Sequence, residues 1–386
     1  MSEPIHCLVT FGTRPEAVKM APLLAALAAR PELFRVTTAV TAQHREMVDQ
    51  VLQVFDLHPE YDLDLMRHGQ TLPDLTGRVL TALTPVLEEA RPDLVLVQGD
   101  TTTVLAGALA AFYQQIAVGH VEAGLRTATI YEPFPEEMNR RLTTRLATLH
   151  FAATGWAAEN LAREGVTQGV YVTGNTVIDA LRSVAQRELP LPPGVTAADL
   201  AGRRLVLVTA HRRENLGEPL ADICRALAAI GEAHQDVVLV YAMHRNPKVR
   251  ETVHAILGER PRVLLIEPPD YFHFVGLLRR AALVLTDSGG IQEEAPALGK
   301  PVLVLRRTTE RPEGVDAGTA RLVGTDPAVI TAAANELLDR PASYQAMAKA
   351  VNPYGDGGAA ARIAAAIAHH FGRGPRPADF QPAARS

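Results

Sequence analysis

At 386 residues the chain is long for a single hydrophobic core, so two domains of about 150–200 residues each are expected. The net charge of −5 excludes an overall basic surface of the kind that binds nucleic acid or anionic membranes, and no apolar run approaches the ~20 residues that span a bilayer. The two cysteines lie in different halves of the chain and the N-terminus lacks a signal-peptide pattern, so the sequence predicts a reduced, cytoplasmic protein.

Short apolar runs alternate with helix-like segments along the whole chain. In the first half the runs lie at 5–11, 34–41, 93–100, 117–123, 149–154 and 170–175. In the second half they lie at 204–211, 237–244, 263–268, 283–290, 301–305 and 320–324. Continuous apolar runs are typical of parallel strands that are covered on both faces. The pattern predicts an α/β fold with two doubly wound, Rossmann-like domains.

The same pattern suggests where the domains begin and end. We expect an N-terminal domain at 1–174 and a C-terminal domain at 175–357, with the Pro- and Gly-rich segment 189–203 as an alternative linker. Segment 358–386 starts with a helix-like stretch, which we expect to pack back on the N-terminal domain, and ends in a flexible tail.

Polar residues collect directly after the predicted strands, where open α/β sheets bind their ligands. After the first strand, Gly12 precedes a helix start that carries Arg14 and, about one turn later, Lys19. Two cations near a helix N-terminus can converge on an anion, and the alternative is a solvated basic helix start. The segment is not a GxGxxG fingerprint, and the chain has no Walker A motif.

Carboxylates follow the later strands of the first half. Asp100 ends the third run, either as a helix N-cap or as a functional group. His120 and Glu122 lie on one face of the fourth run, and a glutamate in an apolar strand end is costly unless it is paired or functional. Glu136 and Glu137 follow two prolines; one is expected to interact with the helix dipole and the other to face the ligand cleft, and the sequence leaves open which.

Histidines follow the first two strands of the second half. His211 stands beside Arg212 and Arg213, which suits phosphate contact or proton transfer. His244 has a weaker case, evenly balanced between function and structure. No spacing of histidine, cysteine and carboxylate residues indicates a metal site.

The segment 286–301, "TDSGGIQEEAPALGKP", combines a glycine turn with an acidic helix. Backbone N–H groups at Ser288–Gly290 form an anion cradle at a helix start. One of the glutamates that follow is placed to bind ribose hydroxyls, and Arg311 adds a cation after the next strand. Together these features predict a nucleoside diphosphate ligand.

Many of these blocks resemble one known family, the bacterial non-hydrolysing UDP-N-acetylglucosamine 2-epimerases. The resemblance runs from about residue 5 to residue 357 and rests on the blocks FGTRPEAVKMAPL, TAQHREM, GDTTT, GHVEAGLRT, PEEMNR, TGNTVIDAL, HRRE, DSGGIQEEAPALGKPVLVLR, TTERPE and NPYGDG. It implies a glycosyltransferase-B-like fold of two Rossmann-like domains facing across a cleft. It further implies a homodimer that needs neither NAD nor a metal, and an enzyme that interconverts UDP-N-acetylglucosamine and UDP-N-acetylmannosamine for cell-surface polysaccharide.

The resemblance also assigns roles to residues. It implies catalytic roles for Asp100, Glu122, Glu136 and His211. It implies UDP contacts at Arg14, Lys19, Phe274, Ser288, Gly289, Gly290, Glu294 and Arg311. Some members bind a second UDP-N-acetylglucosamine as an activator, and the blocks resembling that effector site contain Gln43, Gln70, Arg212 and His244. Pro269 departs from the polar residue expected in close relatives, which puts a side-chain contact with the base in doubt.

The chemistry of the implied reaction fits these residue types. C2 of the sugar bears no acidifying carbonyl, so departure of UDP from C1 must come first, giving a 2-acetamidoglucal intermediate. Acid and base groups that address both faces of C2 are then required. The alternatives are a UDP-sugar-dependent glycosyltransferase of the same fold and a hydrolysing 2-epimerase that releases the free sugar.

Overall fold

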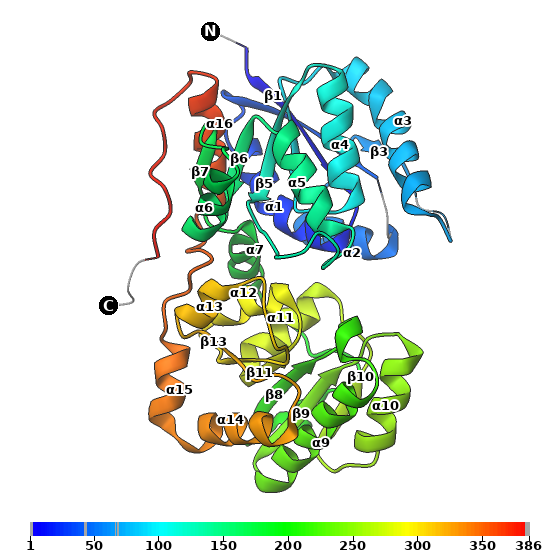
Figure 1. Ribbon diagram of the computed structural model, residues 1–386, viewed down its shortest axis with the longest axis vertical. Helices are drawn as coiled ribbons and strands as arrows, with labels where there is room; N and C mark the ends of the chain where they lie inside the picture. The colour runs from blue at the N-terminus through cyan, green and yellow to red at the C-terminus, as the bar shows by residue number, and fades with distance from the viewer. Residues whose placement is uncertain (1–2, 42–44, 66, 68, 383–386) are drawn as a thin grey trace. The chain divides into compact units, whose positions relative to one another are not determined.

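Two parallel β-sheets, each flanked by helices on both faces, organise the chain into two α/β units, which confirms the predicted fold class (Figure 1). The computed structural model describes residues 3–41, 45–65, 67 and 69–382. Unit 1 consists of Met1–Ala180 together with Tyr354–Gln381, and unit 2 of Leu181–Pro353.

The sheet of unit 1 has the strand order β3-β2-β1-β4-β5-β6-β7 in the described part of the chain. Its strands are β1 (Ile5–Phe11), β2 (Phe34–Val40), β3 (Tyr61–Asp62), β4 (Leu94–Gln98), β5 (Ala117–Ala123), β6 (Leu149–Ala152) and β7 (Val170–Val172). Every residue of β1 and β4 is buried, as expected for parallel strands with helices on both faces. The sequence analysis missed β3, because two residues at a sheet edge give no apolar run.

The helices of unit 1 follow its strands, apart from one that comes from the C-terminal end of the chain. They are α1 (Arg14–Ala28), α2 (Arg45–Phe55), α3 (Leu72–Ala90), α4 (Thr102–Tyr113), α5 (Glu136–Leu146), α6 (Gly155–Arg163), α7 (Thr176–Ala185) and α16 (Ala359–His370). Helix α7 crosses the boundary between the units, and α16 packs against α1. The Asp179 carboxylate in α7 accepts the Ala359 and Ala360 N–H groups at 3.2 and 2.9 Å, so it serves as an external N-cap for α16.

The sheet of unit 2 has the order β10-β9-β8-β11-β12-β13 in the described part of the chain. Its strands are β8 (Arg204–Thr209), β9 (Val237–Ala242), β10 (Val263–Ile266), β11 (Ala281–Thr286), β12 (Val302–Val304) and β13 (Ala320–Leu322). Its helices are α8 (Ala197–Leu200), the 3-10 turn η1 (Arg213–Asn215), α9 (Glu218–Ala233), α10 (Pro247–Leu257), α11 (Tyr271–Arg280), α12 (Gly289–Ala297), α13 (Pro312–Asp316), α14 (Pro327–Asp339) and α15 (Pro341–Ala348).

Both sheets reverse their strand order at one point. In unit 1 the reversal lies between β1 and β4, and in unit 2 between β8 and β11. The crevice beyond the carboxyl ends of the strands at such a switch point is the usual ligand site of an open α/β sheet. The loops that follow these four strands are therefore the first places to look for function.

The segment after α16 runs along the outer edge of β7. The Phe380 N–H donates to the Val172 carbonyl at 2.7 Å, and the Val172 N–H donates to Asp379 Oδ1 at 3.0 Å. The Arg376 guanidinium lies 4.3 Å from the centre of the Tyr171 ring. These contacts cover a strand edge whose backbone groups would otherwise be unpaired.

Candidate active site

Glu122 lies at the carboxyl end of β5 in an unusual backbone conformation. Its φ is 64°, in the left-handed region that non-glycine residues rarely occupy, and the register between β5 and β6 shifts between Val121 and Ala123. Gly124, two residues later, has a φ of 90°, and its position has no room for a side chain, because a Cβ there would overlap the Ala157 carbonyl. Strain of this kind concentrates where side-chain direction matters for function.

Three side chains hold the buried Glu122 carboxylate. Lys19 Nζ lies 2.6 Å from Oε2, Asn175 Nδ2 donates to Oε1 at 3.0 Å, and Gln98 Nε2 also donates to Oε2. The donors come from α1, β4 and the loop before α7, so the carboxylate is fixed from several directions. An ammonium and two amides offset the cost of burying this charge. Lys19, which the sequence analysis assigned to UDP, here pairs with Glu122.

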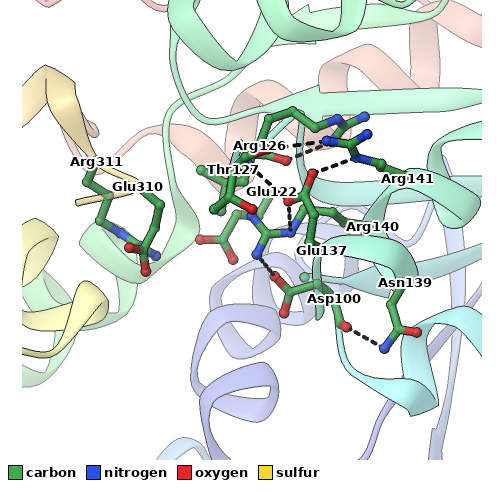
Figure 2. A network of polar contacts seen from close by, with 12 residues as sticks. Asp100, Glu122, Arg126, Thr127, Glu137, Asn139, Arg140, Arg141, Glu310 and Arg311 are labelled. Atoms are coloured by element: carbon green, nitrogen blue, oxygen red, sulfur yellow. Dashed lines mark hydrogen bonds and ion pairs between the residues drawn. The ribbon is translucent and has the colours of Figure 1, made fainter. Parts of the chain in front are cut away.

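Asp100 follows β4 at the switch point of unit 1 (Figure 2). Its Oδ2 lies 3.0 Å from Arg140 Nη2, and its backbone carbonyl accepts Asn139 Nδ2 at 2.9 Å, so α5 holds both ends of the residue. Removal from water raises the pKa of Asp100, while the Arg140 guanidinium opposes this rise. The nearby Glu122 and Glu136 carboxylates raise the pKa further.

The first turn of α5 contains Glu136 and Glu137, whose roles the sequence left open. Glu137 is completely buried; it accepts the Thr127 N–H at 3.1 Å and Arg141 Nε at 2.6 Å, and it lies 3.5 Å from Arg140 Nε (Figure 2). It therefore anchors the loop before α5. Glu136 is half-buried, and its Oε2 is buried without a hydrogen-bond partner among the described residues. The two glutamates therefore have different environments.

Glu16 ties together the two loops at the switch point of unit 1. Its Oε2 accepts the Gly12 and Thr13 N–H groups at 2.6 and 2.8 Å, and its Oε1 accepts the Thr101 hydroxyl. The capping box so formed starts α1 at Arg14, whose side chain is half-buried. Glu16 thus fixes the positions of Arg14 and of the Asp100 loop.

In unit 2, α12 begins at the switch point with Ser288 as its N-cap residue. The Ser288 side chain makes no capping hydrogen bond within the described helix, so the cap does not use its hydroxyl. A Cβ at Gly289 would overlap the Arg311 guanidinium, whereas a Cβ at Gly290 would meet nothing within 4 Å. Gly289 therefore lets a cation approach the helix start, where the helix dipole alone would disfavour it.

The adjacent glutamates of α12 have different partners. Glu293 is buried and accepts Arg311 Nε. Glu294 accepts the Tyr271 hydroxyl at 3.1 Å. Glu310, labelled beside Arg311 in Figure 2, lies 3.1 Å from Arg311 Nη1. Burial opposes ionisation of Glu310, but Arg311 and the neighbouring arginines 306 and 212 outweigh it and lower its pKa to about 2.

His211 follows β8 beside the buried Asp287, which follows β11. Its ring stacks on the His244 ring, with the ring centres 5.2 Å apart and the planes 10° from parallel. Burial lowers the pKa of His211; His244 and Arg212 lower it further, and Asp287 opposes them. The Arg212 guanidinium in turn lies 3.2 Å from Glu310.

The remaining predicted residues lie elsewhere in the two units. Phe274 is half-buried in the first turn of α11, and Pro269 precedes the Asp270 N-cap of that helix. Gln70 precedes α3, and its Oε1 accepts the Arg67 N–H at 3.2 Å and the Arg78 guanidinium. Gln43 lies outside the described residues.

Several residues that position this site were not predicted from the sequence. Gln98 and Asn175 hold Glu122, Arg140 pairs with Asp100, and Asp287 faces His211. The available signal was polarity at the ends of apolar strands, which Gln98 and Asp287 both display. Asn175 lies 53 positions from Glu122, a separation that no local pattern can bridge.

Neither a metal-binding cluster nor a membrane-spanning helix is found among the described residues. The described residues contain no group of three or more His, Cys, Asp or Glu side chains arranged to hold a metal ion. None of the described helices combines the length and hydropathy that crossing a bilayer requires.

Comparisons with known proteins agree along nearly the whole chain. The family model described as UDP-N-acetylglucosamine 2-epimerase matches residues 25–368. The UDP-N-acetylglucosamine 2-epimerase of Escherichia coli K12 is 54% identical over 369 residues, which cover 93% of this chain and 97% of that protein.

Solved structures give the same result. The S. aureus MnaA–UDP structure has a TM-score of 0.88 at 46% identity and covers 98% of this chain and 100% of its own. The Neisseria meningitidis UDP-GlcNAc 2-epimerase bound to UDP-GlcNAc has a TM-score of 0.86 at 44% identity and covers 95% of this chain and 100% of its own. On the family match, the identity and the fold together, the chain belongs to the UDP-N-acetylglucosamine 2-epimerase family.

Proposed function

We propose that this chain interconverts UDP-N-acetylglucosamine and UDP-N-acetylmannosamine by inverting C2 of the sugar. The observation that carries the proposal is the Glu122 carboxylate, buried at a strained strand end and held by Lys19, Gln98 and Asn175. Such a fixed carboxylate suits proton transfer at a carbon atom. The Neisseria relative is described as bound to UDP-GlcNAc, which supports the choice of substrate.

The proposed reaction starts at C1. The C1–O bond breaks with its electron pair leaving on UDP, and C1 gains oxocarbenium character. A base then removes the C2 proton, which gives 2-acetamidoglucal and UDP. An acid returns a proton to the opposite face of C2 while a UDP oxygen re-forms the bond to C1, so the atoms balance without a redox step.

Unit 1 supplies three of the four acid and base groups in this proposal. Glu122 is fixed by its donors, and removal from water raises the pKa of Asp100, so both carboxylates are candidates for proton transfer. Glu136 adds an oxygen that has no hydrogen-bond partner among the described residues. His211 of unit 2 is the fourth candidate for proton transfer, because its lowered pKa favours the neutral imidazole.

Unit 2 supplies the leaving-group site. The α12 N–H groups, the Ser288 hydroxyl and Arg311 form the proposed diphosphate cradle. Glu294 is proposed to bind the ribose, with its carboxylate oriented by Tyr271, and Phe274 to contact the base. The family resemblance also implies UDP contacts at Arg14 and Lys19 of unit 1, and Lys19 in addition pairs with Glu122.

We also propose that a second molecule of UDP-N-acetylglucosamine activates the enzyme through Gln43, Gln70, Arg212 and His244. In support, the His244 ring stacks on the ring of His211, with the ring centres 5.2 Å apart. With UDP-N-acetylmannosamine as the substrate, we expect the rate to depend sigmoidally on substrate concentration. A trace of UDP-N-acetylglucosamine should make this dependence hyperbolic. A hyperbolic curve without added activator would contradict this proposal.

A homodimer is the proposed assembly. Phe112 and Tyr113 at the end of α4 are 55% and 63% exposed, and adjacent exposed aromatic residues are often covered by a partner. Light scattering during size-exclusion chromatography should give about twice the 41.6 kDa mass of the chain. A monomer mass at the concentration used for activity assays would contradict it.

Product identification tests the proposed function. Incubation with UDP-N-acetylglucosamine, followed by proton NMR, should show UDP-N-acetylmannosamine approaching a constant ratio from either direction. Release of free N-acetylmannosamine with UDP would instead indicate a hydrolysing epimerase. Sugar transfer to an acceptor without epimerisation would indicate a glycosyltransferase.

A further inference from the structure

Asp287 is an aspartate buried at the switch point of unit 2. It follows β11, and none of its surface is exposed. Its Oδ2 accepts the His211 and Arg212 N–H groups, each at 2.8 Å, and Asn215 Nδ2 at 2.9 Å. This one oxygen therefore fixes the loop after β8, including the backbone of His211.

The other carboxylate oxygen has a different environment. Asp287 Oδ1 is buried without a hydrogen-bond partner among the described residues, and it lies 3.6 Å from His211 Nδ1. A buried carboxylate oxygen without a donor is costly, so its position calls for an explanation. Catalytic hydrogen bonds are often long in the absence of ligand and tighten when it binds.

In addition to the backbone of His211, the face of its ring is held by a neighbouring side chain. It stacks on His244 with the planes 10° from parallel, while 40% of the His211 side chain remains exposed. The ring is therefore accessible to a ligand, although one of its nitrogens faces a buried carboxylate.

We propose that Asp287 is a positioning residue that accepts the Nδ1–H of His211 and so fixes the tautomer with an unprotonated Nε2. Nε2 then takes a proton from the substrate side, the imidazole becomes imidazolium, and the Asp287 carboxylate stabilises that cation. Returning the proton from Nε2 restores the neutral ring. The catalytic part of this inference rests on the proposed function; the tautomer does not.

The variant Asp287→Asn distinguishes the proposed role in fixing the His211 tautomer from the role in holding the loop after β8. The amide oxygen can still accept the His211, Arg212 and Asn215 donors, but an NH2 group then replaces the oxygen that faces Nδ1. An NH2 donor favours an unprotonated Nδ1, so the tautomer should reverse. Asp287→Ala, which removes both oxygens, reports the cost of losing loop support.

The test is 15N NMR of the full chain labelled at histidine, without substrate, with His211→Gln to assign the signal. Wild type should show His211 protonated at Nδ1, and Asp287→Asn should show it protonated at Nε2. A wild-type His211 protonated at Nε2, or a tautomer unchanged in Asp287→Asn, would overturn the proposal. Because no substrate is present, this result stands apart from the fate of the proposed function.

Activity supplies the second readout. In Asp287→Asn, kcat should fall by about 10²–10⁴-fold, while the UDP Kd and Tm stay close to wild type. Of the charged and titratable groups around His211 in the described part of the chain, Asp287 raises its pKa, whereas His244 and Arg212 lower it. Loss of the Asp287 charge should therefore move the acidic limb due to His211 to lower pH. If activity falls while the His211 tautomer and the pH profile stay unchanged, the positioning role of Asp287 is overturned. The proposed epimerase function is not affected by that result.

A matched control comes from another aspartate–histidine pair of unit 2. Asp339 Oδ1 lies 3.7 Å from His234 Nδ1, but Asp339 is largely exposed. It ends α14 and does not follow a strand, unlike Asp287. Asp339→Asn makes the same chemical change and should leave kcat and the His211 signal unaltered. An equal loss of kcat in this variant would mean that the Asp287 effect is not specific.

Discussion

Glu122 is the residue at which the backbone and the side chain of the site are most constrained. Its left-handed φ directs the carboxylate away from the regular strand geometry, and Lys19, Gln98 and Asn175 hold it there. The sequence predicted that this glutamate must be paired or functional, since an apolar strand cannot accept an isolated charge. Its backbone conformation and two amide partners were not predictable, because they depend on contacts between distant segments.

The first prediction concerns Glu122→Gln. The amide keeps the size of the side chain but cannot act as a base, so kcat should fall by about 10²–10⁴-fold. The measurement is the rate of C2 proton exchange, with circular dichroism and Tm as controls for folding. If the variant unfolds, Glu122 is structural; if exchange continues at the wild-type rate, the proposed role is wrong.

The second prediction concerns the pair of Asp100 and Arg140. Arg140→Met removes the cation that lowers the pKa of Asp100, so the limb of the kcat–pH profile that reports Asp100 should move to higher pH. Misplacement of the carboxylate should also lower kcat by about 10²-fold. Arg145→Met makes the same charge change at an exposed position of α5 and should leave the profile in place. Equal shifts in the two variants would indicate a general charge effect.

At the scale of elements, α12 combines a glycine start, two buried glutamates and the approach of Arg311. The sequence predicted the N–H cradle from the Asp-Ser-Gly-Gly turn. Contact with Arg311 gives Gly289 a further role, and Glu293, which had no predicted task, is the partner that holds Arg311. Glu293 and Arg311 lie 18 residues apart, so their pairing was not visible in the local pattern.

The third prediction compares Gly289→Ala with Gly290→Ala. The added methyl group at residue 289 displaces the Arg311 guanidinium, whereas at residue 290 it meets nothing within 4 Å. UDP affinity, measured by isothermal titration calorimetry, should therefore be about tenfold weaker in Gly289→Ala than in Gly290→Ala. Identical affinities would show that the position of Arg311 does not matter for UDP.

The fourth prediction concerns the cap of α16. Asp179→Ala removes the acceptor for two N–H groups at the start of this helix, so the free energy of unfolding should fall by about 0.5–2 kcal/mol. Asp179→Asn keeps an acceptor oxygen and should lose less. Urea unfolding measures both, and an unchanged midpoint for the alanine variant would contradict the capping role.

On the scale of the whole molecule, the two sheets share the order of their first six strands, and the sheet of unit 1 adds β7 at its edge. In each unit an aspartate follows the strand after the switch point: Asp100 follows β4 and Asp287 follows β11. Continuous apolar strands and the polar residues at their carboxyl ends made both the two-unit α/β fold and these loops predictable. The two-residue strand β3 was missed because it adds almost no apolar sequence signal.

In the proposed mechanism, the C2 proton is removed to give 2-acetamidoglucal, and a proton returns to the opposite face of C2 within the same reaction cycle. Incubation of the enzyme with UDP-N-acetylglucosamine in D2O, followed by mass spectrometry and NMR, tests it most directly. We predict deuterium at C2 of UDP-N-acetylmannosamine from the first turnover, and then in the recovered UDP-N-acetylglucosamine, with neither product labelled in Glu122→Gln. Epimerised product that retains the original hydrogen at C2 would contradict the proposed mechanism.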